Sequence, residues 1–216
     1  MMGSRGLLVV FEGLDRCGKS TQCQKLVERL QKDKLETVLQ SFPDRTTILG
    51  QMINDYLKGN KELNNEVIHL LFSANRWEKN NQMIKNLQNS VNIVLDRYAY
   101  SGVAYSSAKG LDVQWCKNSD IGLLKPDIVF YLYLGEEEQI KRGQYGEEVY
   151  EKKEFQLKVK EKFEQILREE DNIVMVDASK SVQDISDFIY EQFNIKATQI
   201  LKDQEIQKLW VDQQKM

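Results

Sequence analysis

The chain has 216 residues, and its 30 lysines and arginines against 33 aspartates and glutamates leave a net charge of −3. At roughly 100–200 residues per domain, this length predicts one domain over residues 1–216. The balanced charge argues against a general binder of nucleic acid or of anionic membranes. The single histidine argues against a Ser-His-Asp triad or a multi-histidine metal site. Three cysteines without CxxC spacing favour a reducing compartment, the cytoplasm or the nucleus.

Short apolar runs alternate with longer segments of helical spacing. The runs predict strands at Leu7–Phe11, Thr37–Leu39, Val91–Leu95, Ile128–Leu134 and Ile173–Val176. Apolar residues recur every three or four positions between them, at Cys23, Leu26, Val27 and Leu30; at Ile48, Leu49, Met52, Ile53, Tyr56 and Leu57; at Phe155, Val159, Phe163, Ile166 and Leu167; and at Val182, Ile185, Ile189 and Phe193. This alternation predicts an α/β fold with a five-stranded parallel sheet flanked by helices. The first run is too short for a signal peptide or a membrane span. At the other end, an apolar stripe of Ile200, Leu201, Leu209 and Trp210 predicts a packed end helix.

Polar residues follow four of the five predicted strands. They are Glu12 after the first, Asp44 and Arg45 after the second, Asp96 and Arg97 after the third, and Asp177 and Lys180 after the fifth. In open parallel sheets, ligands bind beyond the carboxyl ends of the strands. We therefore expect the functional site at this edge.

Residues 13–21, Gly-Leu-Asp-Arg-Cys-Gly-Lys-Ser-Thr, match the phosphate-binding pattern G-x-x-x-x-G-K-[ST] between a strand and a helix. The pattern predicts a P-loop NTPase-like three-layer fold. Its backbone N–H groups face a polyphosphate, Lys19 reaches the β- and γ-phosphates, and Ser20 holds Mg²⁺. We expect ATP contacts from Gly13, Cys17, Gly18, Lys19, Ser20 and Thr21.

A GTPase is a poor match. The third strand ends in Asp96-Arg97-Tyr98 instead of D-x-x-G, and Asn60-Lys61-Glu62-Leu63 lacks the aspartate of the guanine-reading motif. Phe72 and Arg76 share a helix face, so a ring that can stack on a base lies beside a cation that can read its edge. Arginines at the strand ends suit bidentate binding of a phosphate. The combination predicts a nucleotide as the phosphoryl acceptor.

The sequence resembles the thymidylate kinases. The resemblance lies in Phe11–Thr21, Phe42–Arg45, His69–Glu78, Asp96–Tyr98, Ser101–Tyr105, Lys125–Asp127 and Asp177–Lys180. It implies Mg²⁺-dependent transfer of the γ-phosphoryl group of ATP to dTMP, giving dTDP and ADP in dTTP biosynthesis. It also implies a homodimer.

The resemblance further implies individual roles. Phe72 would stack on thymine and Arg76 would bond to its edge, while Arg45 and Arg97 would hold the acceptor phosphate. Asp15 would lie near the sugar 3′-hydroxyl and the metal waters. Asp96 would hold the Mg²⁺ water shell, and an alternative role as the N-cap of the following helix is compatible with this. Further contacts to dTMP would come from Phe42, Ser101, Gly102, Tyr105, Tyr150 and Gln156, with Tyr105 disfavouring a 2′-hydroxyl, and contacts to ATP from Arg142 and Lys180.

The nucleophile would be a phosphate oxygen that is ionised at neutral pH, so catalysis needs charge neutralisation and no base. The catalytic residues would be Asp15, Arg16, Lys19 and Arg97. A segment at about 142–151, hinged at Gly143 and Gly146, reads as a lid or as a plain surface loop. Residues 143–150 contain no basic residue, so the sequence resembles the type that takes its catalytic arginine, here Arg16, from the P-loop.

Two other interpretations remain open at this stage. One is a kinase of the same architecture for UMP, CMP or a deoxynucleoside. The other is a P-loop regulator that has lost turnover. Two residues have separate predictions: Cys17, at a helix N-terminus beside Arg16 and Lys19, is a candidate reactive thiolate, and His69 is expected to pack behind the base pocket.

Overall fold

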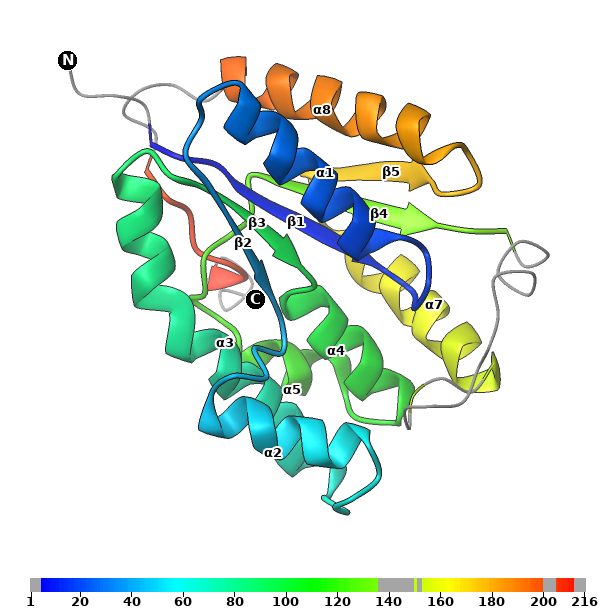
Figure 1. The fold of residues 1–216 in the computed structure, drawn as a ribbon. Coiled ribbons are helices and arrows are strands. Elements are labelled where there is room, and N and C mark those ends of the chain that lie inside the picture. Colours follow the sequence, from blue (N-terminus) through cyan, green and yellow to red (C-terminus); the bar gives the residue numbers. More distant parts are fainter. Residues whose placement is uncertain (1–4, 136–149, 151–152, 200–204, 212–216) are drawn as a thin grey trace.

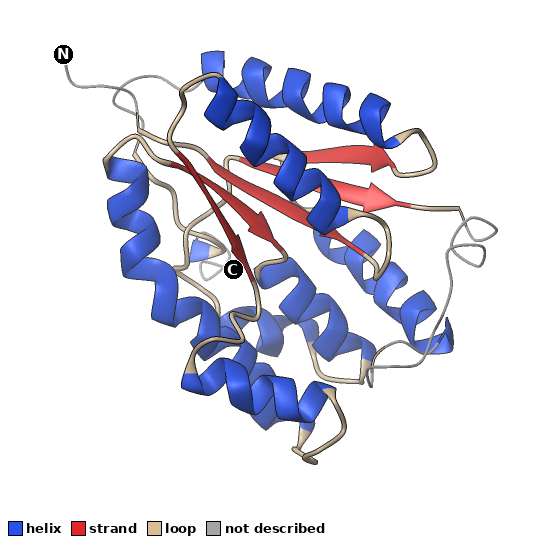
Figure 2. Ribbon diagram, viewed as in Figure 1, coloured by secondary structure: helices blue, strands red, loops and turns tan. Residues whose placement is uncertain are grey.

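The computed structural model describes residues 5–135, 150, 153–199 and 205–211. Its elements are β1 (Leu8–Gly13), α1 (Lys19–Lys32), β2 (Thr37–Ser41), α2 (Ile48–Leu57), α3 (Asn65–Gln88), β3 (Asn92–Asp96), α4 (Ala99–Ala108), α5 (Val113–Asn118), β4 (Ile128–Tyr133), α7 (Lys153–Leu167), β5 (Ile173–Asp177) and α8 (Val182–Gln199). The five strands form one parallel sheet in the order β2-β3-β1-β4-β5 (Figures 1 and 2). The predicted fold class is therefore confirmed.

Helices cover both faces of the sheet. Figure 1 shows α1 and α8 on one face and α3, α4 and α7 on the other. The central strand β1 serves both layers, because alternate side chains point to opposite faces. Leu8 and Val10 pack into the cluster on the α3 and α4 side, whereas Val9 and Phe11 pack into the cluster on the α1 and α8 side. Burial on both faces explains why the strand begins with the unbroken apolar run Leu8–Phe11.

The first turn of α2 departs from the predicted pattern. Ile48 was expected on the inner face, but it is 78% exposed. The inner position is occupied by Gly50, where a Cβ would lie only 1.8 Å from the carbonyl oxygen of Asp44. The close approach of the β2–α2 loop therefore turns Ile48 outward.

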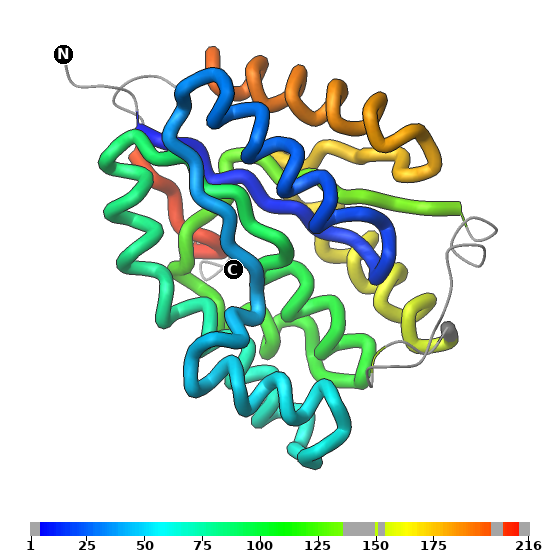
Figure 3. The backbone as a smooth tube through the Cα atoms, in the orientation of Figure 1, coloured from blue at the N-terminus to red at the C-terminus, as the bar shows by residue number. Residues whose placement is uncertain are grey.

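The predicted end helix is wrong over its described part. Residues 205–211, the last coloured stretch of the tube in Figure 3, contain an antiparallel bridge between Lys208 and Leu124. Leu209 and Trp210 are nevertheless buried as expected. Ile200 and Leu201 lie outside the described residues. Within the described ranges, no helix is long and apolar enough to cross a membrane.

Trp210 ties this segment to the α4 layer. Its ring meets Tyr100 edge-on at 5.8 Å, and its Nε1 donates a hydrogen bond to Glu170 at 2.8 Å. We expect Trp210→Ala to lower the free energy of unfolding by about 3–5 kcal/mol, as a buried aromatic replaced by alanine does. Val211→Ala, at a neighbouring exposed site, should change it by less than about 0.5 kcal/mol. Denaturant unfolding of both variants tests this, and equal effects would contradict it.

Candidate active site

The P-loop between β1 and α1 has the backbone of an anion site. Gly13 has a φ of 138°, and a Cβ there would lie 2.3 Å from the carbonyl oxygen of Leu132. Gly18 is the N-cap of α1 in the left-handed region, with no capping side chain and no acidic residue in the first turn. Because Gly18 offers no capping side chain, the first N–H groups of α1 can receive a phosphate.

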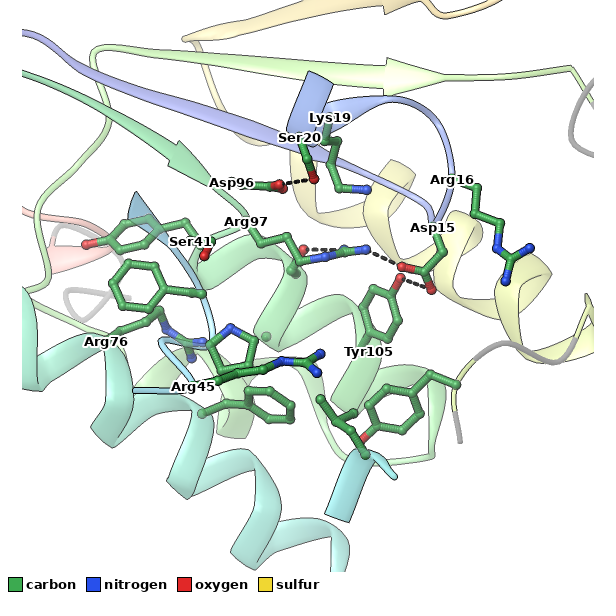
Figure 4. A pocket seen from close by; sticks show the side chains of 18 of the residues that line it. Asp15, Arg16, Lys19, Ser20, Ser41, Arg45, Arg76, Asp96, Arg97 and Tyr105 are labelled. Carbon is green, nitrogen blue, oxygen red and sulfur yellow. Dashed lines mark hydrogen bonds and ion pairs between the residues drawn. The ribbon is translucent and has the colours of Figure 1, made fainter. Parts of the chain in front are cut away.

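Lys19 and Ser20 begin α1 at the mouth of this loop. Lys19 is buried, and its Nζ donates a 2.6 Å hydrogen bond to the carbonyl oxygen of Leu14. Ser20 Oγ donates to the carboxylate of Asp96 at the end of β3 (Figure 4). The cap of α4 is Tyr98, without a side-chain bond, so the alternative role of Asp96 as a helix cap is wrong.

An ion pair between Arg97 and Asp15 crosses the site (Figure 4). The other guanidinium nitrogen of Arg97 donates to the Gly13 carbonyl oxygen at 3.2 Å and to Ser101 Oγ at 3.1 Å. Asp15 also accepts from Tyr105 Oη at 3.0 Å and from Gln156 Nε2 at 2.7 Å. Burial alone would raise the pKa of Asp15, but the charges of Arg97 and Lys19 and these hydrogen bonds hold it below its usual range. Asp15 is therefore a carboxylate at neutral pH.

Sequence reasoning gave no role to Glu12, which organises α4. Its carboxylate is fully buried and accepts from the backbone N–H groups of Tyr98 and Ser101 at 2.9 and 3.0 Å. It also accepts from Ser101 Oγ. Burial raises the pKa of Glu12, against the opposing effects of its hydrogen bonds to Ser101 and of the Arg97 charge. An acidic residue that interrupts a buried apolar run was the available signal for this role.

Arg76 is held by a partner that the sequence did not reveal. Its Nε and Nη2 donate to the carboxylate of Asp120 at 3.2 and 2.6 Å, and both side chains are essentially buried. A Cβ at Gly102 would lie 2.7 Å from Arg76 Nη2 and 2.9 Å from Nη1. Gly102 thus lets the guanidinium lie flat against α4, with Nη1 outside the bonds to Asp120.

These elements enclose a cavity of about 410 Å³ (Figure 4). The predicted site residues that line it are Asp15, Arg16, Gly18, Lys19, Ser20, Thr21, Phe42, Arg45, Phe72, Arg76, Asp96, Arg97, Ser101, Gly102, Tyr105 and Tyr150. Ser41, Pro43, Leu57, Tyr98 and Ser106 also line it, without having been predicted. The structure therefore brings most of the predicted site residues together around one cavity.

The other predicted residues lie elsewhere. Gln156 is buried on α7, where it bonds to Asp15 and to the carbonyl oxygen of Tyr150 at 2.9 Å. Gly13 is the last residue of β1, at the start of the P-loop, and Lys180 is an exposed residue after β5. Arg142 and the predicted lid, except Tyr150, lie outside the described residues.

Cys17 faces inward. Its side chain is 2% exposed and packs into the apolar cluster of the α1 and α8 layer. Its Sγ lies 3.6 Å from Lys19 Nζ. The hypothesis of a reactive thiolate needs solvent access, which this position does not provide.

Comparison with known proteins gives consistent matches. Residues 11–189 match the family model described as thymidylate kinase. The chain is 48% identical to the thymidylate kinase of Dictyostelium discoideum, over 89% of this chain and 87% of that protein. It is 43% identical to the human thymidylate kinase, over 88% of this chain and 90% of that protein. The solved structure of the Candida albicans thymidylate kinase superposes with a TM-score of 0.86 at 38% identity, covering 94% of this chain and 98% of that one.

The buried pair of Arg76 and Asp120 gives a test of this arrangement. We expect Asp120→Asn to lower the free energy of unfolding by about 3 kcal/mol, because it leaves a buried guanidinium without its counter-charge. Asp171→Asn is the matched control, since the side chain of Asp171 is 82% exposed in its pair with Lys125 and should contribute no more than about 1 kcal/mol. Urea unfolding at pH 7 compares them. A loss under about 1 kcal/mol for Asp120→Asn would contradict the proposed importance of the pair.

Proposed function

The chain belongs to the thymidylate kinase family, and we infer that it transfers the γ-phosphoryl group of ATP to dTMP, forming dTDP and ADP. The observation that supports this most directly is the single cavity that joins a P-loop to an arginine-rich acceptor pocket. In this reaction an oxygen of the dTMP phosphate bonds to the γ-phosphorus. The bond from that phosphorus to the oxygen it shares with the β-phosphate breaks, and ADP leaves.

We propose that the donor phosphates bind over the N-terminus of α1. The uncapped N–H groups and the Lys19 ammonium supply positive potential there. The Ser20 hydroxyl and the Asp96 carboxylate fit Mg²⁺, a cation that prefers oxygen ligands and retains waters and substrate phosphates. Ser20 and Asp96, which are hydrogen-bonded to each other, are therefore the candidate anchors. When bound, Mg²⁺ would neutralise charge on the phosphates.

We propose that Arg97 and Arg45 hold the acceptor phosphate. Arg97 is fixed by Asp15, the Gly13 carbonyl oxygen and Ser101, so little reorganisation would accompany phosphate binding. Arg45 donates to Asn54 Oδ1 on α2 at 2.9 Å and lines the same cavity. The dTMP phosphate needs no base, and the lowered pKa of Asp15 is consistent with a role in holding Arg97 rather than in accepting a proton.

The nucleoside would lie between α3 and α4. Phe72 and Arg76 line this part of the cavity and offer a ring to stack on thymine and a donor for its edge. Tyr105 on α4 donates a hydrogen bond from its Oη to Asp15 in the P-loop. Its phenol ring is the group that we propose to exclude a 2′-hydroxyl and so favour deoxyribose.

Several features of the enzyme extend this proposal. We propose that residues 1–216 act as one kinase domain whose segment at about 142–151, with Arg142, closes over ATP, and that Lys180 lies near the adenine. We also propose a homodimer that works in the cytoplasm or the nucleus. The family resemblance and the fold support these points.

Arg16 projects from the P-loop and lines the cavity (Figure 4). We expect Arg16→Ala to lower kcat by roughly 10³, the scale for an arginine that stabilises charge in phosphoryl transfer, while the Kd for dTMP stays within about twofold. Arg29→Ala, whose side chain pairs with Asp187 on α8, is the control and should leave kcat unchanged. A kcat for Arg16→Ala within about tenfold of wild type, about 1.4 kcal/mol in barrier, would contradict the assignment.

The reaction itself is tested by measuring ADP formed from ATP and Mg²⁺ with dTMP, dUMP, UMP, dCMP, dGMP or AMP, against a blank without acceptor. We expect the highest kcat/KM with dTMP. Turnover with another acceptor alone would overturn the base assignment. No turnover in folded, ATP-binding protein would instead favour a P-loop regulator.

A further inference from the structure

The single histidine lies directly behind the proposed base pocket. His69 is fully buried on α3, three residues before Phe72. Its Nδ1 lies 2.8 Å from Ser106 Oγ on α4. Its Nε2 lies 3.0 Å from the carbonyl oxygen of Cys116 and 3.1 Å from Ser119 Oγ. The expectation that His69 packs behind this pocket is confirmed.

These partners fix the tautomer of His69. A carbonyl oxygen can only accept, so Nε2 must carry the proton that is donated to Cys116. Ser119 Oγ donates its own proton to the same carbonyl oxygen at 3.1 Å, and can therefore also accept from Nε2. Burial and the nearby Arg76 charge lower the pKa of His69, so the ring is neutral at pH 7. In a neutral imidazole the second nitrogen is an acceptor, and Nδ1 consequently receives the hydroxyl proton of Ser106.

Ser106 belongs to the wall of the cavity. It lines the cavity together with Phe72 and Arg76. It also lies four residues after Gly102, the position against which the Arg76 guanidinium rests, so the two positions share a face of α4. Since its one proton is committed to His69, Ser106 Oγ can offer a ligand only lone pairs.

We propose that His69 and Ser106 set the hydrogen-bond polarity of the base pocket, so that it accepts a proton from the N3–H of thymine and rejects cytosine. The proposal rests on the proposed function and names the base class that the site selects. Cytosine carries a lone pair at N3, which would face the lone pairs of Ser106 Oγ and leave both unbonded. Uracil has the same N3–H as thymine, so this device separates thymine and uracil from cytosine but not from each other.

Ser106→Ala removes the acceptor and tests the proposal. We expect kcat/KM for dTMP and for dUMP to fall about tenfold, the lower end of the discrimination that an unpaired polar group gives, while kcat/KM for dCMP does not fall. The ratio of dTMP to dCMP then drops about tenfold, and the ratio of dTMP to dUMP is unchanged. Ser107→Ala is the matched control. Ser107 is equally buried on α4 and bonds to the Ala104 carbonyl oxygen, so both ratios should stay as in the wild type.

His69→Leu gives a second, independent readout. It removes the acceptor of the Ser106 proton, and Ser119 still supplies a donor to the Cys116 carbonyl oxygen. The freed hydroxyl can then donate to cytosine N3, and we expect kcat/KM for dCMP to rise. A purely structural role would instead lower kcat/KM for dTMP, dUMP and dCMP together.

The outcomes separate this proposal from the function itself. An unchanged ratio of dTMP to dCMP in Ser106→Ala, or an equal fall for all acceptors, would overturn the proposal and leave the kinase activity intact. Calorimetric Kd values for dTMP, dUMP and dCMP accompany the kinetics and need no turnover. A wild type without dTMP turnover would overturn the proposed function, while the Kd ratios would still decide the polarity of the pocket.

Discussion

The ion pair between Arg97 and Asp15 is the interaction on which the rest of the site depends. Asp15 lies in the loop after β1, and Arg97 follows β3. These strands are hydrogen-bonded neighbours with Phe11 opposite Asp96, so the parallel sheet delivers both loops to the same edge. Tyr105 from α4 and Gln156 from α7 also bond to Asp15. The P-loop, Arg97 and two helices are thus joined at the carboxylate of Asp15, which keeps its charge at neutral pH because its pKa is lowered.

A second constraint is that Glu12, Arg76 and Asp120, which lie behind the cavity, are buried and hydrogen-bonded inside the protein. Glu12 accepts hydrogen bonds from backbone N–H groups at the N-terminus of α4, and Asp120 forms an ion pair with Arg76. Burying a charge is costly unless it is paired and hydrogen-bonded, so these networks fix the position of Ser101, Gly102 and Arg76 before any nucleotide arrives. Dipoles and charges that are already oriented cost no reorganisation during reaction. This is consistent with a kinase that neutralises charge and moves no proton to a side chain.

The sequence predicted the parts of this structure that depend on local pattern. The strand runs, the P-loop and most of the helical spacing each occupy a short stretch, and these elements were found close to where they were expected. Contacts between residues far apart in the chain were not predicted. Asp120 lies 44 residues from Arg76, and Ser106 lies 37 residues from His69. Apolar spacing also predicted burial of Leu209 and Trp210 but not the bridge and turn that they form part of, because a short apolar stripe does not fix the backbone conformation. Ile48 was misplaced because spacing does not show that a loop packs on Gly50.

The central claim is that one continuous cleft, spanned by Arg97 and Asp15, receives ATP and dTMP with their phosphates facing each other. Inhibition by a compound in which adenosine and thymidine are joined through a polyphosphate chain tests this most directly. One continuous cleft predicts binding of one molecule per chain, more tightly than dTMP, with competitive inhibition against both ATP and dTMP. Competition against only one of the two nucleotides would contradict it.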